Sequence, residues 1–278
     1  MRVRVLGSAA GGGCPQWNCA CTVCQGARRA GRNRSQDTVA VSGDGAAWYL
    51  LNAGPDVRSQ IIGAPELAPG PGLRETPLRG VLLTTAELDH TLGLLSLREA
   101  VRLSVHATPA VTAALSTAFP LRPMLARYTR LDWCDLSDGL TLDGGLTVRR
   151  LTVGTKRPRY APDAAGDDWV SALRLTDTRT GSSFVYATCL PAWSEAFDGF
   201  VAGADEVLLD GTFGTDDELT RATGRPGSAR SMGHLPMAES RPRLAGHRGT
   251  RFRYGHLNNT NPAVGDVVAD GSVLFGER

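Results

Sequence analysis

Three cysteines near the start of the chain have the spacing of a metal-binding loop. Cys19, Cys21 and Cys24 form a C-x-C-x-x-C pattern within the 278-residue sequence. Thiolates are soft ligands, and Zn²⁺ commonly takes four of them or a mixture of cysteine and histidine. The loop offers only three ligands, so the sequence predicts a structural zinc whose fourth ligand comes from a distant segment. Three free or buried thiols without a metal are the competing interpretation.

A second group of candidate ligands follows a predicted strand at residues 80–85. Glu87, Asp89 and His90 stand there, just before an apolar helical pattern. Carboxylates and imidazoles at a strand end are able to bind a metal. The alternative is structural, with Asp89 capping the helix and His90 hydrogen-bonded in the turn.

A third candidate segment lies late in the chain, after a predicted strand at residues 251–254. It contains His256 and continues into an asparagine-rich turn with Asn258 and Asn259. Asparagine tolerates left-handed turns, so a tight loop alone would also explain this composition. His256 and Asn259 are three residues apart and point to opposite faces of an extended segment. One of them could therefore serve an active site while the other faces the cysteine loop.

Composition excludes several classes of protein. The formal net charge is +2, from 30 basic and 28 acidic residues, which gives no support for a nucleic-acid or anionic-membrane partner. Apolar runs are too short for a membrane span, and residues 1–7 have the pattern of a strand rather than a signal peptide. Clustered cysteines favour a reducing cytoplasm. We expect the other three cysteines, Cys14, Cys134 and Cys189, to be small packing residues.

The elements that must position these residues are mostly short strands. Runs of strand length and composition occur at residues 2–6, 38–41, 48–51, 80–85, 104–107, 146–153, 170–175, 184–187, 206–209, 251–254 and 272–275. Helical patterning occurs at residues 92–103, 109–119, 191–201 and 216–223. Many strands with helices between some of them predict a layered α/β body.

Together these segments resemble the metallo-β-lactamase superfamily. Its members typically carry His-x-His-x-Asp-His after a strand, whereas residues 85–90 here read Thr-Ala-Glu-Leu-Asp-His. Within the superfamily, the chain resembles the B-protein family of pyrroloquinoline quinone (PQQ) biosynthesis, either as a true member or as a paralogue. The matching stretches span nearly the whole chain: residues 6–13, 15–19, 52–53, 55–56, 89–91, 93–99, 209–212, 216–218, 232–235, 258–262 and 270–271, with His256.

The resemblance implies an αββα sandwich of two mixed sheets flanked by helices. It further implies one domain over residues 1–278, with the zinc loop at about residues 14–24. Similar phosphodiesterases of phosphonate breakdown use this loop as a structural zinc site, and their fourth ligand is a histidine where this chain has Asn259. Asn259, a water molecule and a residue from another loop are all open as the fourth ligand here.

The resemblance also implies a reaction. Two-metal hydrolases of the superfamily use about five histidines and a bridging aspartate. This chain has five histidines in total, and residues 186–189 (YATC) stand where the bridging aspartate is expected. One metal held by His90, His256 and a carboxylate, Asp89 or Glu87, instead matches the ligand set of non-haem Fe(II) oxygenases.

Members of the B-protein family are understood as iron-dependent hydroxylases of a tyrosine ring in a crosslinked, peptide-derived intermediate. By resemblance we expect Fe(II) in the active site, a structural zinc, a small peptide-derived substrate and O₂. We expect neither nucleic acid nor a membrane as partner, and a homodimer is the assembly to test.

Further residues receive roles by the same resemblance. Glu87 and His234 are the candidate catalytic groups, for acid–base chemistry or substrate binding. Asp56 and Asp210 end strands and could orient ligands, although turn capping is the alternative. Arg98 could pair with a substrate carboxylate, although a solvated helix arginine is the commoner case. The remaining candidates for the site are Asn258 and Asn259.

Two other functions stay open from the sequence. One is a metallo-β-lactamase-fold hydrolase or phosphodiesterase, against which the replaced histidines argue. The other is a non-catalytic carrier of a biosynthetic product. Residues 156–168 and 237–247 differ in character from the family, and such differences suggest a paralogue that acts in another natural-product pathway.

Overall fold

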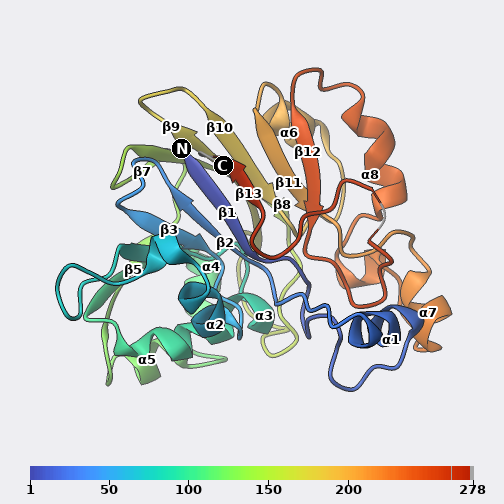
Figure 1. Ribbon diagram of the computed structural model, residues 1–278, viewed down its shortest axis with the longest axis horizontal. Helices are drawn as coiled ribbons and strands as arrows, with labels where there is room; N and C mark the ends of the chain where they lie inside the picture. Colours follow the sequence, from blue (N-terminus) through green and yellow to red (C-terminus); the bar gives the residue numbers. More distant parts are fainter. Residues whose placement is uncertain (264, 276–278) are drawn as a thin grey trace.

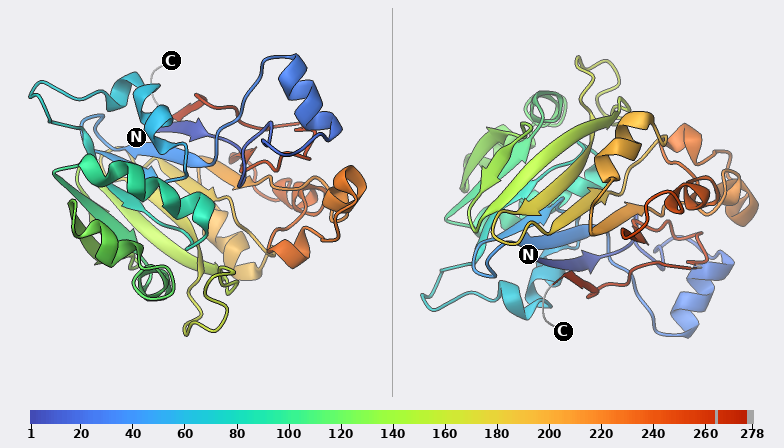
Figure 2. Two further views of the ribbon diagram at one scale, coloured as in Figure 1. Left: turned by 90° about the horizontal axis from the view of Figure 1, so that it is seen from below. Right: turned by 90° about the horizontal axis from the view of Figure 1, so that it is seen from above.

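Two β-sheets stacked face to face form the centre of the computed structural model, which describes residues 1–263 and 265–275 (Figures 1 and 2). In spatial order, the first sheet contains β13 (Val273–Phe275), β1 (Arg2–Gly7), β2 (Thr38–Ser42), β3 (Trp48–Leu51), β4 (Leu78–Leu82), β5 (Arg102–Ala107) and β6 (Arg130–Asp135). The second contains β12 (Arg251–Gly255), β11 (Glu206–Asp210), β10 (Ser183–Ala187), β9 (Val170–Asp177), β8 (Leu146–Gly154) and β7 (Leu140–Leu142).

Both sheets mix parallel and antiparallel pairs. Strands β3 to β6 run parallel in the first sheet, and β10 to β12 run parallel in the second. The other neighbours are antiparallel. Parallel strands end at the same edge of a sheet, so loops that follow them converge there. In this chain those loops carry most of the candidate ligands.

Side chains alternate between the two faces of each strand, and this alternation explains how the layers pack. In β3, Tyr49 and Leu51 face the other sheet, where they pack with Phe184 and Tyr186 of β10. Leu50 of the same strand packs outward beneath the helices, because successive side chains of a strand point to opposite faces.

Helices cover the outer face of each sheet. The α-helices are α1 (Thr22–Arg29), α2 (Val57–Ile62), α3 (Leu88–Thr91), α4 (Pro109–Ala114), α5 (Leu121–Leu125), α6 (Glu195–Val201), α7 (Glu218–Thr223) and α8 (Met237–Leu244). Side chains of α2, α4 and α5 pack on the first sheet, and those of α6 and α8 on the second. The predicted αββα sandwich is therefore confirmed.

One predicted helix is wrong in type. The expected helix at residues 92–103 is a 3-10 segment, Leu92–Glu99, and the chain is already in strand β5 from Arg102. At Gly93 an added Cβ would lie 2.2 Å from the Gly54 carbonyl oxygen, so this segment is pressed against the preceding loop. Among the described residues, we find no helix that combines the length and apolarity of a membrane span.

Candidate active site

Loops from both sheets enclose a cavity of about 530 Å³ at one edge of the sandwich. His90 follows β4, Cys189 follows β10, and His256 directly follows β12. His234, Lys156 and several apolar groups complete the wall. A volume of this size is typical of pockets for small-molecule ligands.

Two imidazoles meet a carboxylate at the base of the cavity. The rings of His90 and His256 are 5.2 Å apart between centroids, and both residues are buried. The Asp89 Oδ2 atom lies 3.3 Å from His256 Nε2 and 4.0 Å from His90 Nε2. The structure therefore brings together the three residues that the sequence proposes as iron ligands, although His256 is far from the other two in sequence.

Threonine hydroxyls orient both rings. Thr85 Oγ1 lies 2.7 Å from His90 Nδ1, and Thr212 Oγ1 lies 2.8 Å from His256 Nδ1. Engaging Nδ1 in this way fixes the ring and directs Nε2 toward the cavity, as in many metal sites. The His90 Nε2 atom is buried and has no hydrogen-bond partner among the described residues. A buried imidazole nitrogen without a partner is expected where a metal would supply the missing contact.

Backbone conformation supports the same position. His256 has φ of 54°, in the left-handed region that costs a non-glycine residue about 1–2 kcal/mol. Such conformations persist at sites where the surrounding structure holds a side chain in a required place. On the opposite side, an added Cβ at Gly11 would lie 3.2 Å from Asp89 Oδ2, so a side chain there would crowd the carboxylate.

Asp37 is a site residue that the sequence reasoning missed. It is buried before β2, and its Oδ2 atom accepts hydrogen bonds from the Tyr186 hydroxyl and from Thr188 Oγ1. The same oxygen lies 4.0 Å from His90 Nε2, and Oδ1 has no partner among the described residues. A single aspartate before a strand carries no sequence signal of this role.

The site holds two acidic side chains, of which Asp37 is buried and Asp89 is half-buried. Burial raises the pKa of Asp37 to about 6. Burial acts in the same direction on Asp89, but His90 and His256 outweigh it and hold the pKa of Asp89 below its usual range. Burial lowers the pKa of His90 to about 4. Although burial also opposes the charged form of His256, the hydrogen bond to Asp89 and the nearby carboxylates raise its pKa to about 9.

These groups fit a bound cation. Buried carboxylates are stable only when they are paired or coordinate a metal. Asp37 and Asp89 stand beside two Nε2 atoms, one of which lacks a partner among the described residues. Two imidazoles and a carboxylate suit Fe(II), and also Zn²⁺.

His234 and Asp210 form a hydrogen-bonded pair beside the two imidazoles. The Nδ1 atom of His234 donates to Asp210 Oδ2 at 2.7 Å, and the His234 ring stacks on His256 at 5.6 Å. Asp210 Oδ2 also accepts from the backbone of Leu190. Asp210 thus orients His234, whose Nε2 atom is left for the cavity. One ligand atom each of Asp210, His234 and His256 also lie within 4.8 Å of one another.

Glu87 has a different partner from the one expected. Its carboxylate pairs with Lys156 Nζ at 3.5 Å, and Lys156 also donates to the Met232 carbonyl at 2.6 Å. Glu87 lines the cavity. Of the two carboxylates proposed for the metal, Asp89 has the better position, because its Oδ2 atom lies 3.3 Å and 4.0 Å from the two imidazole Nε2 atoms, whereas the Glu87 carboxylate pairs with Lys156.

Cys189 is not a simple packing residue. It is half-buried and lines the cavity, and its sulfur belongs to a group with ligand atoms of His90 and His256, all within 4.8 Å of one another. Burial, together with nearby carboxylates, raises the pKa of its thiol well above the usual value. Cys14 is buried as expected, whereas Cys134 is exposed at the edge strand β6.

Other predicted residues lie at the rim or outside. Asp56 Oδ2 accepts from the backbone of Gln36 at 2.9 Å, so it supports a cavity residue rather than a ligand. Asn258 lines the cavity. Arg98 is half exposed, pairs with Glu99 and does not line the cavity, so its position matches the alternative of a solvated arginine.

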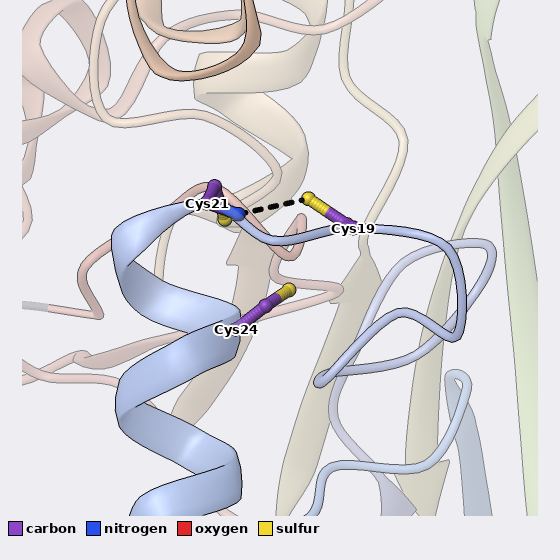
Figure 3. Close-up of side chains that lie close together, drawn as sticks. All are labelled: Cys19, Cys21 and Cys24. Atoms are coloured by element: carbon purple, nitrogen blue, oxygen red, sulfur yellow. Dashed lines mark hydrogen bonds between the residues drawn. The ribbon is translucent and has the colours of Figure 1, made fainter.

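The cysteine loop forms a second cluster next to α1. The sulfurs of Cys19, Cys21 and Cys24 lie within 4.8 Å of one another. Figure 3 shows the three side chains close together, with Cys24 on the helix and Cys19 on the loop before it. The Asn259 carbonyl accepts from the Cys21 thiol at 3.5 Å, and Asn259 Nδ2 donates to Cys24 Sγ at 3.3 Å. Asn259 thus contacts two of the three cysteines and stays a candidate for the fourth ligand.

The chain matches known proteins over nearly its whole length. Residues 47–256 match the family model of the beta-lactamase superfamily domain. Coenzyme PQQ synthesis protein B of Azoarcus sp. (strain BH72) is 42% identical, over 95% of this chain and 91% of that protein. The protein of the same description from Methylorubrum extorquens is 37% identical over the same shares.

Solved structures show the same relationship. The crystal structure of Zn²⁺-bound PqqB from Methylobacterium extorquens is 34% identical and superposes with a TM-score of 0.87, covering 99% of this chain and 100% of that one. A diphosphatase of the PhnP family shares the fold, with a TM-score of 0.72, 18% identity, and coverage of 99% of this chain and 98% of that one. By sequence and structure, the chain belongs to the PqqB family of the β-lactamase superfamily.

Proposed function

We propose that this protein is an Fe(II)-dependent oxygenase that hydroxylates a tyrosine-derived ring of a peptide-derived intermediate, in the biosynthesis of PQQ or a related product. The observation that carries the proposal is the convergence of His90, His256 and Asp89, with a buried Nε2 atom on His90 that has no partner among the described residues. Membership of the PqqB family supports the pathway.

Replacement of two motif histidines favours one metal over two. The position of the first is taken by Thr85, which orients His90, and that of the second by Glu87, which pairs with Lys156. Both side chains are engaged in contacts that do not bind a metal. A two-metal hydrolase would lack these ligands, so the phosphodiesterase alternative has less support.

Fe(II), when bound by two imidazoles and a carboxylate with open positions, supplies the activation of dioxygen. In the overall reaction, one oxygen atom of O₂ replaces a ring hydrogen as a hydroxyl group. The other oxygen atom is reduced to water, and an added reductant such as ascorbate supplies the two protons and two electrons that this needs. Asp89, His90 and His256 would hold the metal, and Thr85 and Thr212 would keep the two rings in place.

Residues of the cavity can bind and orient a phenolic amino-acid substrate. The His234 Nε2 atom, with Nδ1 bonded to Asp210, is suited to accept the phenol proton. Lys156 and Arg159 bring positive charge to the cavity wall, which suits the carboxylates of an amino-acid-derived compound. They would take the role that the resemblance suggested for Arg98.

The cysteine loop is proposed to hold a structural zinc. Support comes from the mutual approach of its three sulfurs and from the presence of Zn²⁺ in the PqqB crystal structure from Methylobacterium extorquens. The zinc would join the N-terminal loop to the turn after β12 and would take no part in the reaction.

Oxygen consumption and isotope incorporation test the reaction. Protein that carries zinc in the loop is reconstituted anaerobically with Fe(II) and supplied with the glutamate–tyrosine crosslinked compound, ascorbate and ¹⁸O₂. We expect one ¹⁸O atom in each newly hydroxylated ring, detected by mass spectrometry. Zinc-loaded, iron-free protein is assayed in parallel on bis(p-nitrophenyl) phosphate. Rapid phosphodiester hydrolysis without hydroxylation would favour the hydrolase, and the absence of both activities with iron bound would favour the carrier.

A further inference from the structure

Cys189 brings a thiol to the edge of the proposed metal site from a third part of the chain. It follows β10, whereas His90 follows β4 and His256 follows β12. A soft sulfur donor thus stands beside two imidazoles at the same edge of the sandwich.

Distances fit coordination by one ion. Ligand atoms of Cys189, His90 and His256 lie within 4.8 Å of one another. With metal–sulfur bonds of about 2.3 Å and metal–nitrogen bonds of about 2.1 Å, two donors of a tetrahedral ion are about 3.6 Å apart. Side-chain movements of up to about 1 Å would therefore bring all three to bonding distance.

An independent observation points to a ligand in the same place. The His90 Nε2 atom is fully buried and has no hydrogen-bond partner in the described part of the chain. It faces the cavity that Cys189 also lines. Asp37 Oδ1 is a second buried atom near this ring for which the described residues offer no partner. The thiol thus belongs to a group of polar atoms that a bound ion would satisfy, and it is not an isolated cysteine.

We propose that Cys189 is a ligand of the active-site metal, in addition to His90, His256 and Asp89. On binding, the thiol S–H bond breaks, the sulfur bonds to the metal, and the proton leaves to solvent. A thiolate selects softer ions such as Fe(II) or Zn²⁺ against Mg²⁺ or Mn²⁺. The proposal rests on the metal site of the proposed function, but it does not require the oxygenase reaction.

X-ray absorption at the iron edge tests this ligand directly. The samples are Fe(II)-loaded protein with zinc in the cysteine loop, the variant Cys189→Ser, and the matched control Cys134→Ser, whose cysteine is exposed and remote from the cavity. We expect a sulfur scatterer at the iron in the unmodified protein and in the control. The sulfur contribution should be lost in Cys189→Ser while iron is still bound by the remaining ligands.

Each other result has a distinct meaning. Iron bound in the unmodified protein with only nitrogen and oxygen neighbours overturns the thiolate ligand but leaves the proposed function intact. The same holds if Cys189→Ser keeps the full sulfur signal. Failure of the unmodified protein to bind iron overturns both proposals. If the serine variant does not fold, Cys189→Ala gives the same comparison.

Discussion

The cysteine loop and the imidazole site are built in opposite ways. In the loop, three sulfurs come from six consecutive residues, and only Asn259 comes from afar. In the imidazole site, Asp89 and His90 are neighbours, but their partners come from other strands of both sheets. The first can form as soon as a short segment folds, whereas the second exists only after the two sheets have packed.

One loop connects the two sites. His256 contacts Asp89, while Asn259, three residues later, contacts Cys21 and Cys24. A metal in the cysteine loop would therefore stabilise the turn that positions an active-site ligand. On the proposed function, the local site would be a support and the assembled site would carry the chemistry.

The largest effect is expected from His90→Ala. Removing one of two imidazoles should abolish iron binding and reduce hydroxylation by more than about 100-fold, a larger loss than removal of a supporting residue causes. Zinc in the cysteine loop should stay at its original stoichiometry. Emission spectrometry of both metals, with oxygen uptake, measures this.

A matched control is His247→Ala, which removes an imidazole that pairs with Asp198 outside the cavity. It should bind both metals normally. Full iron occupancy in His90→Ala would break the distinction between the two sites.

Cys21→Ser should have the opposite signature. We expect loss of the zinc and of about 3 kcal/mol in stability, which corresponds to a decrease of about 6–12 °C in Tm for domains of similar size. Iron affinity should fall only several-fold, through the shared loop at His256 and Asn259. Calorimetry and metal analysis measure the two effects. Cys134→Ser, at an exposed position, should leave Tm unchanged; an equal decrease there would remove the evidence for a zinc staple.

The same contrast explains what could be predicted from the sequence. The cysteine spacing is informative alone, because all three ligands lie in one short segment. The pairing of His90 with His256 needed the resemblance to a family, since spacing says nothing about which strand ends meet in space. The αββα fold followed from the same resemblance, and the strand patterns alone gave only a layered α/β body.

Asp37 and Cys189 escaped prediction for a physical reason. Each is one polar residue beside a strand, and its role comes from neighbours across the sheets, such as Tyr186 for Asp37. Helix α8 was also missed, because its sequence includes Pro242 and two arginines and shows little apolar periodicity. Arg98 received its role from the resemblance, and its half-exposed position matches the alternative of a solvated arginine.

Thr85→Val should weaken iron binding by less than His90→Ala does and should leave the cysteine loop unaffected. Valine has nearly the shape of threonine but cannot contact His90 Nδ1, now 2.7 Å from the hydroxyl. Loss of such a supporting contact costs about 10–100-fold in metal affinity, and we expect the lower end for iron because the ring stays packed. Zinc should not change. Titration with Fe(II) measures the affinity, and Thr85→Ser should restore it. Unchanged affinity in Thr85→Val would mean that packing alone orients His90.

Lys156→Met should give the smallest effect, and it separates substrate binding from metal binding. Lys156 is partly exposed, so its interaction with a substrate carboxylate is worth about 1 kcal/mol and is weakened by salt. We expect KM to rise about fivefold, with kcat and both metals nearly unchanged, because about 1 kcal/mol corresponds to this factor in affinity. Lys156→Arg keeps the charge and should keep most of the affinity.

Glu87→Gln frees Lys156 from its ion pair, so KM should fall or stay constant. A rise in KM for Glu87→Gln as large as that for Lys156→Met would instead mean that the Glu87–Lys156 contact holds the cavity wall in shape and that the lysine does not bind substrate.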